Sequence, residues 1–196
     1  MQELNDSNET ITTYQKELSV PTFEKEEKIT NAQKGTLMHL CIQHLDESKE
    51  YEIKDIEELI DELCFKNIIT EKQKEAINKN TILKYTKSEL FKELKQAKEI
   101  HKEEPFYINI PASEIYAKEV EENVLVQGII DLYYINKEGN VILVDYKTDY
   151  AESENELKEK YKEQLNLYKK ALENSLNVKV SKVIIYSLYM QKEIEL

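Results

Sequence analysis

Two apolar runs separated by a short polar turn constrain the fold of this chain most strongly. Residues 123–135, NVLVQGIIDLYYI, and residues 141–147, VILVDYK, are rich in the β-branched and aromatic side chains that favour strands. Between them, residues 136–140 read NKEGN, which is a turn signal. The two runs are therefore predicted to form a β-hairpin.

The register of this hairpin brings two carboxylates together. If the turn is centred near Glu138, Ile135 faces Val141 and Asp131 faces Asp145. Directly opposed residues have Cβ atoms about 4.5–5.5 Å apart. Asp is depleted in strands, and opposed like charges destabilise a sheet. The pair therefore needs a counter-charge.

Lys147 supplies part of that counter-charge, because residues i and i+2 of a strand share a face. One ammonium against two carboxylates leaves a negative site that suits Mg²⁺, which prefers oxygen ligands and keeps several waters beside a substrate phosphate. Such a metal lowers the pKa of a bound water, and Lys147 would orient that water or stabilise the transition state. The alternative is that Asp131 lies exposed on an edge strand and that Asp145 and Lys147 form an ordinary surface pair.

The rest of the chain predicts helices around a mixed sheet. Helical apolar spacing is found over 35–45, 55–66, 71–79, 80–100 and 154–174. Further strands are expected at 106–110, ended by Pro111, and at 183–189. This order predicts an α/β core with helices packed on the sheet. Residues 1–34 are expected to be an irregular lead-in, and residues 48–100 a helical insert.

Composition limits the classes of function. Cys41 and Cys64 are the only cysteines, and both are expected to be reduced core residues. Two cysteines are too few to hold alone an iron–sulfur cluster of the cubane type or a four-cysteine zinc site. The formal net charge of −12 argues against general affinity for nucleic acid, so any DNA would be delivered by other domains or subunits. No stretch approaches the roughly 18 apolar residues of a membrane span, and MQELNDSNET has no signal-peptide core. We therefore expect a cytoplasmic protein with no membrane partner.

Four motifs resemble, in order, the RecB-type nuclease domains of the PD-(D/E)XK superfamily. They are AQKGTLMH at 32–39, EEPF at 103–106, QGIID at 127–131 with VDYKTD at 144–149, and YKEQLNLY at 161–168. Within that family the likeness is nearest to the C-terminal nuclease domain of AddA-type helicase-nuclease subunits. It covers most of the chain, although the sequence of residues 48–100 does not align. The resemblance implies a restriction-endonuclease-like core within a nuclease domain over 35–196.

The resemblance also implies a role for each site residue. The implied metal ligands are His39, Asp131, Asp145 and the backbone carbonyl of Tyr146. The other implied active-site residues are Lys147 as the catalytic lysine, Glu103, Gln164 and Tyr161. Glu103 is preferred to its neighbour Glu104 because it lies three residues before Phe106. The implied cofactor is Mg²⁺, for which Mn²⁺ can substitute, without an iron–sulfur cluster.

The resemblance further implies a fragment of a larger helicase-nuclease. The chain has no Gly-x-x-x-x-Gly-Lys-Ser/Thr loop for ATP phosphates, so a separate motor would deliver single-stranded DNA, beside an AddB-type partner subunit. The leading hypothesis is a Mg²⁺-dependent nuclease that cleaves single-stranded DNA during double-strand-break repair and recombination. The alternatives are a stand-alone exonuclease of the Cas4 type and a non-catalytic module that docks a partner.

Overall fold

A five-stranded mixed sheet organises the residues that the computed structural model describes, which are 28–112 and 122–196. In order across the sheet, its strands are β1 (Glu99–Pro111), β2 (Asn123–Ile135), β3 (Val141–Lys147), β4 (Val180–Ser187) and β5 (Lys192–Glu195). Only β3 and β4 run parallel, and the other neighbours are antiparallel. Helix α7 (Glu154–Leu176) makes the crossover that a parallel pair requires.

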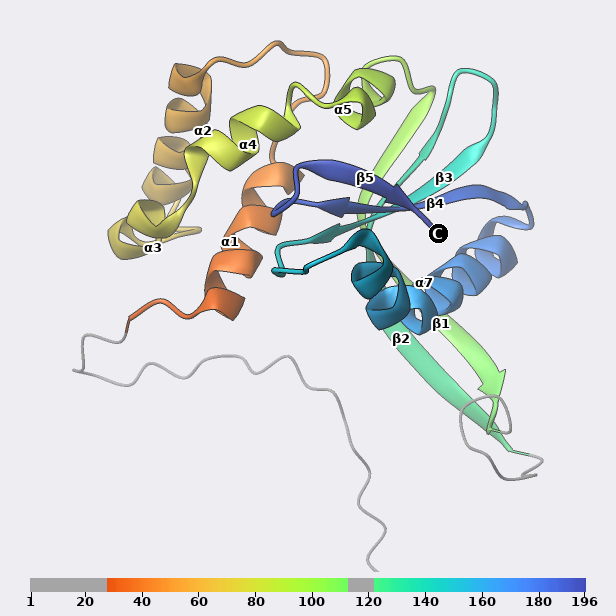
Figure 1. Cartoon of the computed structure of the whole chain (residues 1–196). Coiled ribbons are helices and arrows are strands. Elements are labelled where there is room, and N and C mark those ends of the chain that lie inside the picture. The colour runs from red at the N-terminus through yellow and green to blue at the C-terminus, as the bar shows by residue number, and fades with distance from the viewer. Residues whose placement is uncertain (1–27, 113–121) are drawn as a thin grey trace, which may run out of the picture.

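Helices cover both faces of this sheet (Figure 1). Before the sheet come α1 (Asn31–Gln43), α2 (Ile53–Phe65), α3 (Glu71–Ala76), α4 (Lys79–Tyr85) and α5 (Glu89–Leu94). These five helices share a core with one face of the sheet, which includes Tyr134 and Val144. Helix α7 packs on the other face with Leu143 and Ile185. The predicted α/β core with helices on a mixed sheet is confirmed.

The hairpin of β2 and β3 has the predicted bounds and register. Its ladder runs from the pair Ile135–Val141 to the pair Leu132–Val144, which places Asp131 opposite Asp145 at the next position. The turn is held by Asn136, whose side-chain oxygen accepts hydrogen bonds from the backbone nitrogens of residues 138 and 140 at 3.1 and 2.8 Å. Gly139 supplies the positive φ of 91° that the turn needs.

Several predicted boundaries were wrong. The helix expected over 80–100 is two short helices, because Ser88 caps α5 by accepting a hydrogen bond from the backbone nitrogen of Phe91. Residues 99 and 100 belong to β1, which starts well before the expected 106. Helix α1 begins at Asn31, inside the expected lead-in, after a capping box made by Thr30 and Gln33. The remainder of that lead-in, residues 1–27, lies outside the described residues.

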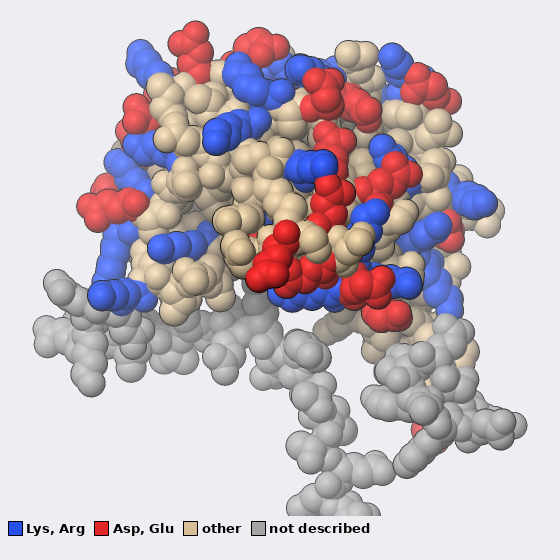
Figure 2. Space-filling model, in the orientation of Figure 1, with Lys and Arg blue, Asp and Glu red and all other residues tan. Residues whose placement is uncertain are grey.

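Charged side chains of both signs are interspersed over the face that Figure 2 shows, in the same orientation as Figure 1. None of the helices in the described ranges is long and apolar enough to cross a membrane. Of the two cysteines, Cys41 is fully buried in α1, whereas Cys64 is partly exposed and donates a hydrogen bond to Glu71. The expectation of a buried core thiol is therefore confirmed for Cys41 alone.

Candidate active site

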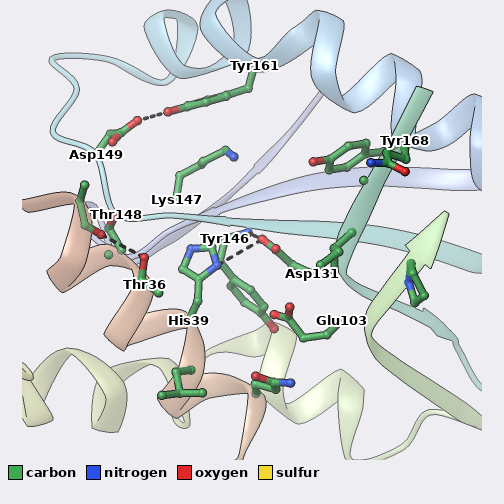
Figure 3. Close-up of a pocket in the computed structure, with 18 of the residues that line it drawn as sticks. Thr36, His39, Glu103, Asp131, Tyr146, Lys147, Thr148, Asp149, Tyr161 and Tyr168 are labelled. Carbon is green, nitrogen blue, oxygen red and sulfur yellow. Dashed lines mark hydrogen bonds and ion pairs between the residues drawn. The ribbon is translucent and has the colours of Figure 1, made fainter. Parts of the chain in front are cut away.

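A cleft of about 800 Å³ lies where α1 and α7 approach the same end of β3. Figure 3 shows its labelled side chains pointing into a common space, His39 from α1, Asp131 from β2, Lys147 from β3 and Tyr161 from α7. Of the eight residues to which the sequence assigned a role, six line this cleft directly, namely His39, Glu103, Asp131, Tyr146, Lys147 and Tyr161. Asp145 and Gln164 lie just behind them, each in contact with Lys147.

The sheet changes its alternation where Glu103 and Asp131 lie. Lys102 pairs with Leu132 and Glu104 with Ile130, so Glu103 falls opposite Asp131. Ile130 is buried in the core beneath α7, whereas Leu132 is buried in the core on the opposite face of the sheet. Residues two apart on a strand normally share a face, so the alternation of side chains along β2 shifts by one residue at Asp131. Glu103 itself adopts a left-handed conformation with φ 53°, which costs a non-glycine residue on the order of 1 kcal/mol. The distortion carries Glu103, and not Glu104, to the cleft wall.

Asp131 is held by the backbone of the neighbouring strand. Its Oδ2 accepts a hydrogen bond of 2.9 Å from the backbone nitrogen of Tyr146 and lies 3.6 Å from Nδ1 of His39. Burial alone lowers the pKa of His39, but the carboxylates of Asp131 and then Asp145 outweigh it and raise the pKa above its ordinary value. The imidazole therefore already lies in a negative field.

Asp145 is a carboxylate taken almost completely out of water. It is 1% exposed, and its Oδ2 lies 2.8 Å from Nζ of Lys147. That contact has the distance of an ion pair but not hydrogen-bond geometry, so the buried Oδ2 has no hydrogen-bond partner. Burial raises the pKa of Asp145 above its ordinary value despite the opposing effect of Lys147, and the charge of Asp131 raises it further. A buried carboxylate that is paired with one ammonium but makes no hydrogen bond through this oxygen remains costly unless a further group binds it.

Lys147 is fixed by three neighbours. Besides the ion pair with Asp145, its Nζ donates to Oε1 of Gln164 at 3.2 Å and lies 4.2 Å from the ring centre of Tyr161. Gln164 is itself oriented because its Nε2 donates to the hydroxyl of Tyr168 at 2.7 Å. The surface-pair alternative for Asp145 and Lys147 is wrong, because the side chain of Asp145 is 2% exposed and that of Lys147 only 15%.

Two glycines permit the close packing that forms the cleft. A Cβ on Gly35 would lie 2.7 Å from Oγ1 of Thr148, so α1 approaches the end of β3 more closely than any other residue would allow. One turn further along α1, His39 reaches the cleft. A Cβ on Gly128 would lie 2.6 Å from the ring of Phe106, its partner across β1 and β2.

The sequence motifs include Asp149 and Tyr168, but neither residue was assigned a role in the site. The hydroxyl of Tyr161 donates to the carboxylate of Asp149, which also pairs with Lys160 at 2.8 Å. The signal was present in both cases, since Asp149 repeats the two-residue spacing of Asp145 and Lys147, and Tyr168 lies four residues after Gln164.

The donor set fits a divalent cation in chemistry, although the site is not a closed cage. Among the described residues, no three His, Cys, Asp or Glu side chains converge as a ready-made metal site. The carboxylates of Asp131 and Asp145 could supply oxygen ligands, and His39 could add a nitrogen. Oδ2 of Asp145, which meets Lys147 as an ion pair but makes no hydrogen bond, is the atom best placed to bind a cation.

Comparison with known proteins decides the family. The family model described as "PD-(D/E)XK nuclease superfamily" matches residues 13–195. The chain belongs to this superfamily. Its nucleases generally use divalent metal ions, and the mixed sheet with flanking helices is the expected fold, so the predicted nuclease fold is confirmed.

The relatives of this nuclease domain are helicase-nuclease subunits. It is 38% identical over 179 residues to the AddA subunit of the ATP-dependent helicase/nuclease of Clostridium acetobutylicum, covering 86% of this chain and 14% of that protein. It is 39% identical over 180 residues to the same subunit of Clostridium botulinum strain Hall, covering 88% of this chain and 14% of the relative. For Clostridium novyi strain NT the identity is 35% over 184 residues. The predicted likeness to AddA-type nuclease domains is confirmed, and the chain spans about one seventh of these relatives' length.

Proposed function

We propose that this nuclease domain hydrolyses phosphodiester bonds of single-stranded DNA with Mg²⁺, as part of an AddAB-type helicase-nuclease that processes double-strand breaks in the cytoplasm. The family match and the relatives support a nuclease. The nucleic-acid strand, the metal and the assembly are our proposals. The buried Asp145 carboxylate, with Asp131 and the ammonium of Lys147 beside it in one cleft, is the observation that carries the proposal.

Asp131, Asp145 and His39, with the backbone carbonyl of Tyr146, would hold the metal. The negative field of the two carboxylates, which raises the pKa of His39, is consistent with binding a cation. A bound divalent cation supplies Lewis acidity toward a phosphate oxygen and lowers the pKa of a bound water.

The side chains of the domain would orient the reacting groups. Lys147 presents an ammonium to the cleft, where it donates to an attacking water or to a phosphate oxygen as negative charge develops. Gln164 and Tyr161 hold this ammonium in place. The backbone nitrogen of Tyr146 fixes the orientation of Asp131. Because these groups come from rigid strands and one long helix, little reorganisation is needed when substrate binds.

The charge of the domain favours delivery of the substrate by another part of the machine. With a net charge of −12, the domain gains little from neutralising phosphates. A helicase motor that pushes single-stranded DNA into the cleft would remove the need for high affinity of the domain itself for DNA. An AddB-type partner would complete the assembly. The domain is therefore expected to cut the strand that it is given.

Incubation of the chain with end-labelled single-stranded DNA and either Mg²⁺ or Mn²⁺ tests the proposal. We expect cleavage that EDTA abolishes, and a loss of about 100-fold or more in Asp145→Asn and Lys147→Met. The matched controls are Asp61→Asn and Lys66→Met, whose side chains on and after α2 are 61% and 56% exposed. These controls should cut like the unmodified chain. Absence of cleavage by the unmodified chain, or equal cleavage by all five proteins, would refute the catalytic assignment.

A further inference from the structure

Strands β1 and β2 continue together as a two-stranded ribbon beyond the rest of the sheet (Figure 1). Residues 132–135 of β2 pair with both β1 and β3, whereas residues 123–130 pair with β1 alone. One side of the ribbon is buried, because Phe106, Ile108 and Ile110 join the core beneath α7. Its other side is exposed to solvent.

The exposed side carries no charged residue over the segments 105–109 and 125–129. Its members are Pro105, Tyr107, Asn109, Leu125, Gln127 and Ile129, which we call the ribbon platform. They form adjacent cross-strand pairs, with Tyr107 opposite Gln127 at the centre. Tyr107 is 70% exposed, Leu125 60% and Ile129 43%. In a chain of which 34% is charged, an exposed face made only of apolar, aromatic and amide side chains is unusual.

The ribbon platform is continuous with the active-site cleft. Pro105, Tyr107, Gln127 and Ile129 line the same cavity as Asp131 and Lys147. When the reacting group of a ligand lies beside Asp131, the adjoining segment of that ligand therefore lies over Tyr107. This continuity separates the platform from other exposed apolar side chains, such as Phe65 on α2, which is not among the residues that line the cleft.

We propose that the ribbon platform binds the unstacked bases of single-stranded nucleic acid, while the sugar-phosphate backbone of that strand enters the cleft. The inference rests on the proposed function and adds the feature that selects single strands. Every base has a face that can stack on an aromatic ring, so such a platform tolerates any sequence. The amides of Asn109 and Gln127 can meet base edges. A duplex keeps its bases stacked inside and cannot present them to Tyr107.

Charge supports the same ligand. All 27 Lys and Arg residues of the chain are Lys. Without Arg, the chain lacks the guanidinium group that binds a phosphate through two parallel hydrogen bonds. With a net charge of −12, affinity has to come chiefly from contacts other than counterion release. Stacking on an uncharged surface is such a contact.

A fluorescence titration tests the platform without cleavage. Because the chain has no Trp, Tyr107→Trp introduces a single reporter. With Ca²⁺ in place of Mg²⁺, and again in EDTA, we expect oligothymidylate to quench this Trp strongly. An abasic oligonucleotide of equal length, which has the same phosphates and no bases, and a duplex should quench it little. Phe65→Trp, at a position 88% exposed, is the matched control and should respond to none of them.

Anisotropy of labelled oligothymidylate measures the affinity itself. Tyr107→Ala should weaken binding about 5-fold or more, whereas Tyr107→Phe, which keeps the ring, and Phe65→Ala should bind like the unmodified chain. Equal quenching by the abasic strand, absence of quenching or of binding in both buffers, or full affinity of Tyr107→Ala would overturn the platform. A different result tests the proposed function: cleavage of DNA by Asp145→Asn as fast as by the unmodified chain would refute it.

Discussion

The contact between Tyr85 and Tyr146 joins the helical segment over residues 53–94 to the strand that carries the active site. Tyr85 on α4 and Tyr146 on β3 are 1% and 5% exposed, and their hydroxyls lie 2.6 Å apart. Their rings meet edge to face at 5.5 Å. Burial raises the pKa of both phenols, so both hydroxyls stay neutral at working pH. We predict that this hydrogen bond stabilises the fold measurably.

The size of the effect follows from what each substitution leaves behind. Tyr85→Phe removes one hydroxyl and leaves that of Tyr146 buried without a partner, which costs about 1–3 kcal/mol. Tyr146→Phe leaves the hydroxyl of Tyr85 in the same position, with a similar cost. The double variant removes both hydroxyls and keeps both rings, so it should be close to the unmodified protein in stability. The predicted coupling energy is therefore about as large as the two single losses added together.

Urea unfolding followed by circular dichroism gives the free energy of unfolding of the four proteins, and thermal unfolding gives a second measure. For a chain of this size, 1 kcal/mol corresponds to about 2–4 °C in Tm. Each single variant should unfold earlier, and the double variant should recover most of the loss. Single losses that add up in the double variant would show that the two hydroxyls do not satisfy each other, and the reasoning would be refuted.

Three further predictions concern the cleft and the core. Gly128→Ala places a Cβ against the ring of Phe106 and should lower the free energy of unfolding by about 1–3 kcal/mol in urea; an unchanged midpoint would count against the close approach. Gln164→Leu should lower the cleavage rate about 10- to 100-fold at unchanged Tm, with the loss in kcat and not in KM, since Gln164 positions Lys147. A pure KM effect would contradict this role. Burial raises the pKa of Cys41 to about 12, so in Cys64→Ala the remaining thiol should resist Ellman's reagent at pH 8 until urea unfolds the chain. In the unfolded chain this thiol ionises near pH 9, well before it does in the folded protein. Cys41 should therefore lower the free energy of unfolding as pH rises from about 9 to 12, and Cys41→Ala should not show this loss of stability.

Local sequence patterns predicted the elements that local forces make. The strands on either side of residues 136–140 have the predicted bounds, because the turn signal and the runs of β-branched and aromatic residues are local features of the sequence. Helix α7 begins at the predicted residue for the same reason, with Ser153 as its N-cap. The opposition of Asp131 and Asp145 follows from the turn by counting. These features needed no knowledge of distant residues.

Features that depend on distant pairing were missed. The start of β1 at Glu99 reflects pairing with Ile135 across the sheet, which overrides the helical spacing of residues 80–100. Strand β5 exists because it pairs with β4, and four residues carry too weak a pattern to predict a strand. The positive φ of Glu103 also has no local signature, since a left-handed glutamate is tolerated only where the surrounding sheet imposes it.

The sequence by itself determined the hairpin, the paired carboxylates with their lysine, and the family whose motifs they complete. The tertiary structure alone decided that Asp145 is buried against Lys147, that Gln164 and Tyr161 hold Lys147, and that the ribbon platform continues the cleft. The physical reason is that register and periodicity act over a few residues. Burial, charge and cavity shape instead depend on which distant segments pack together, and no local pattern records that.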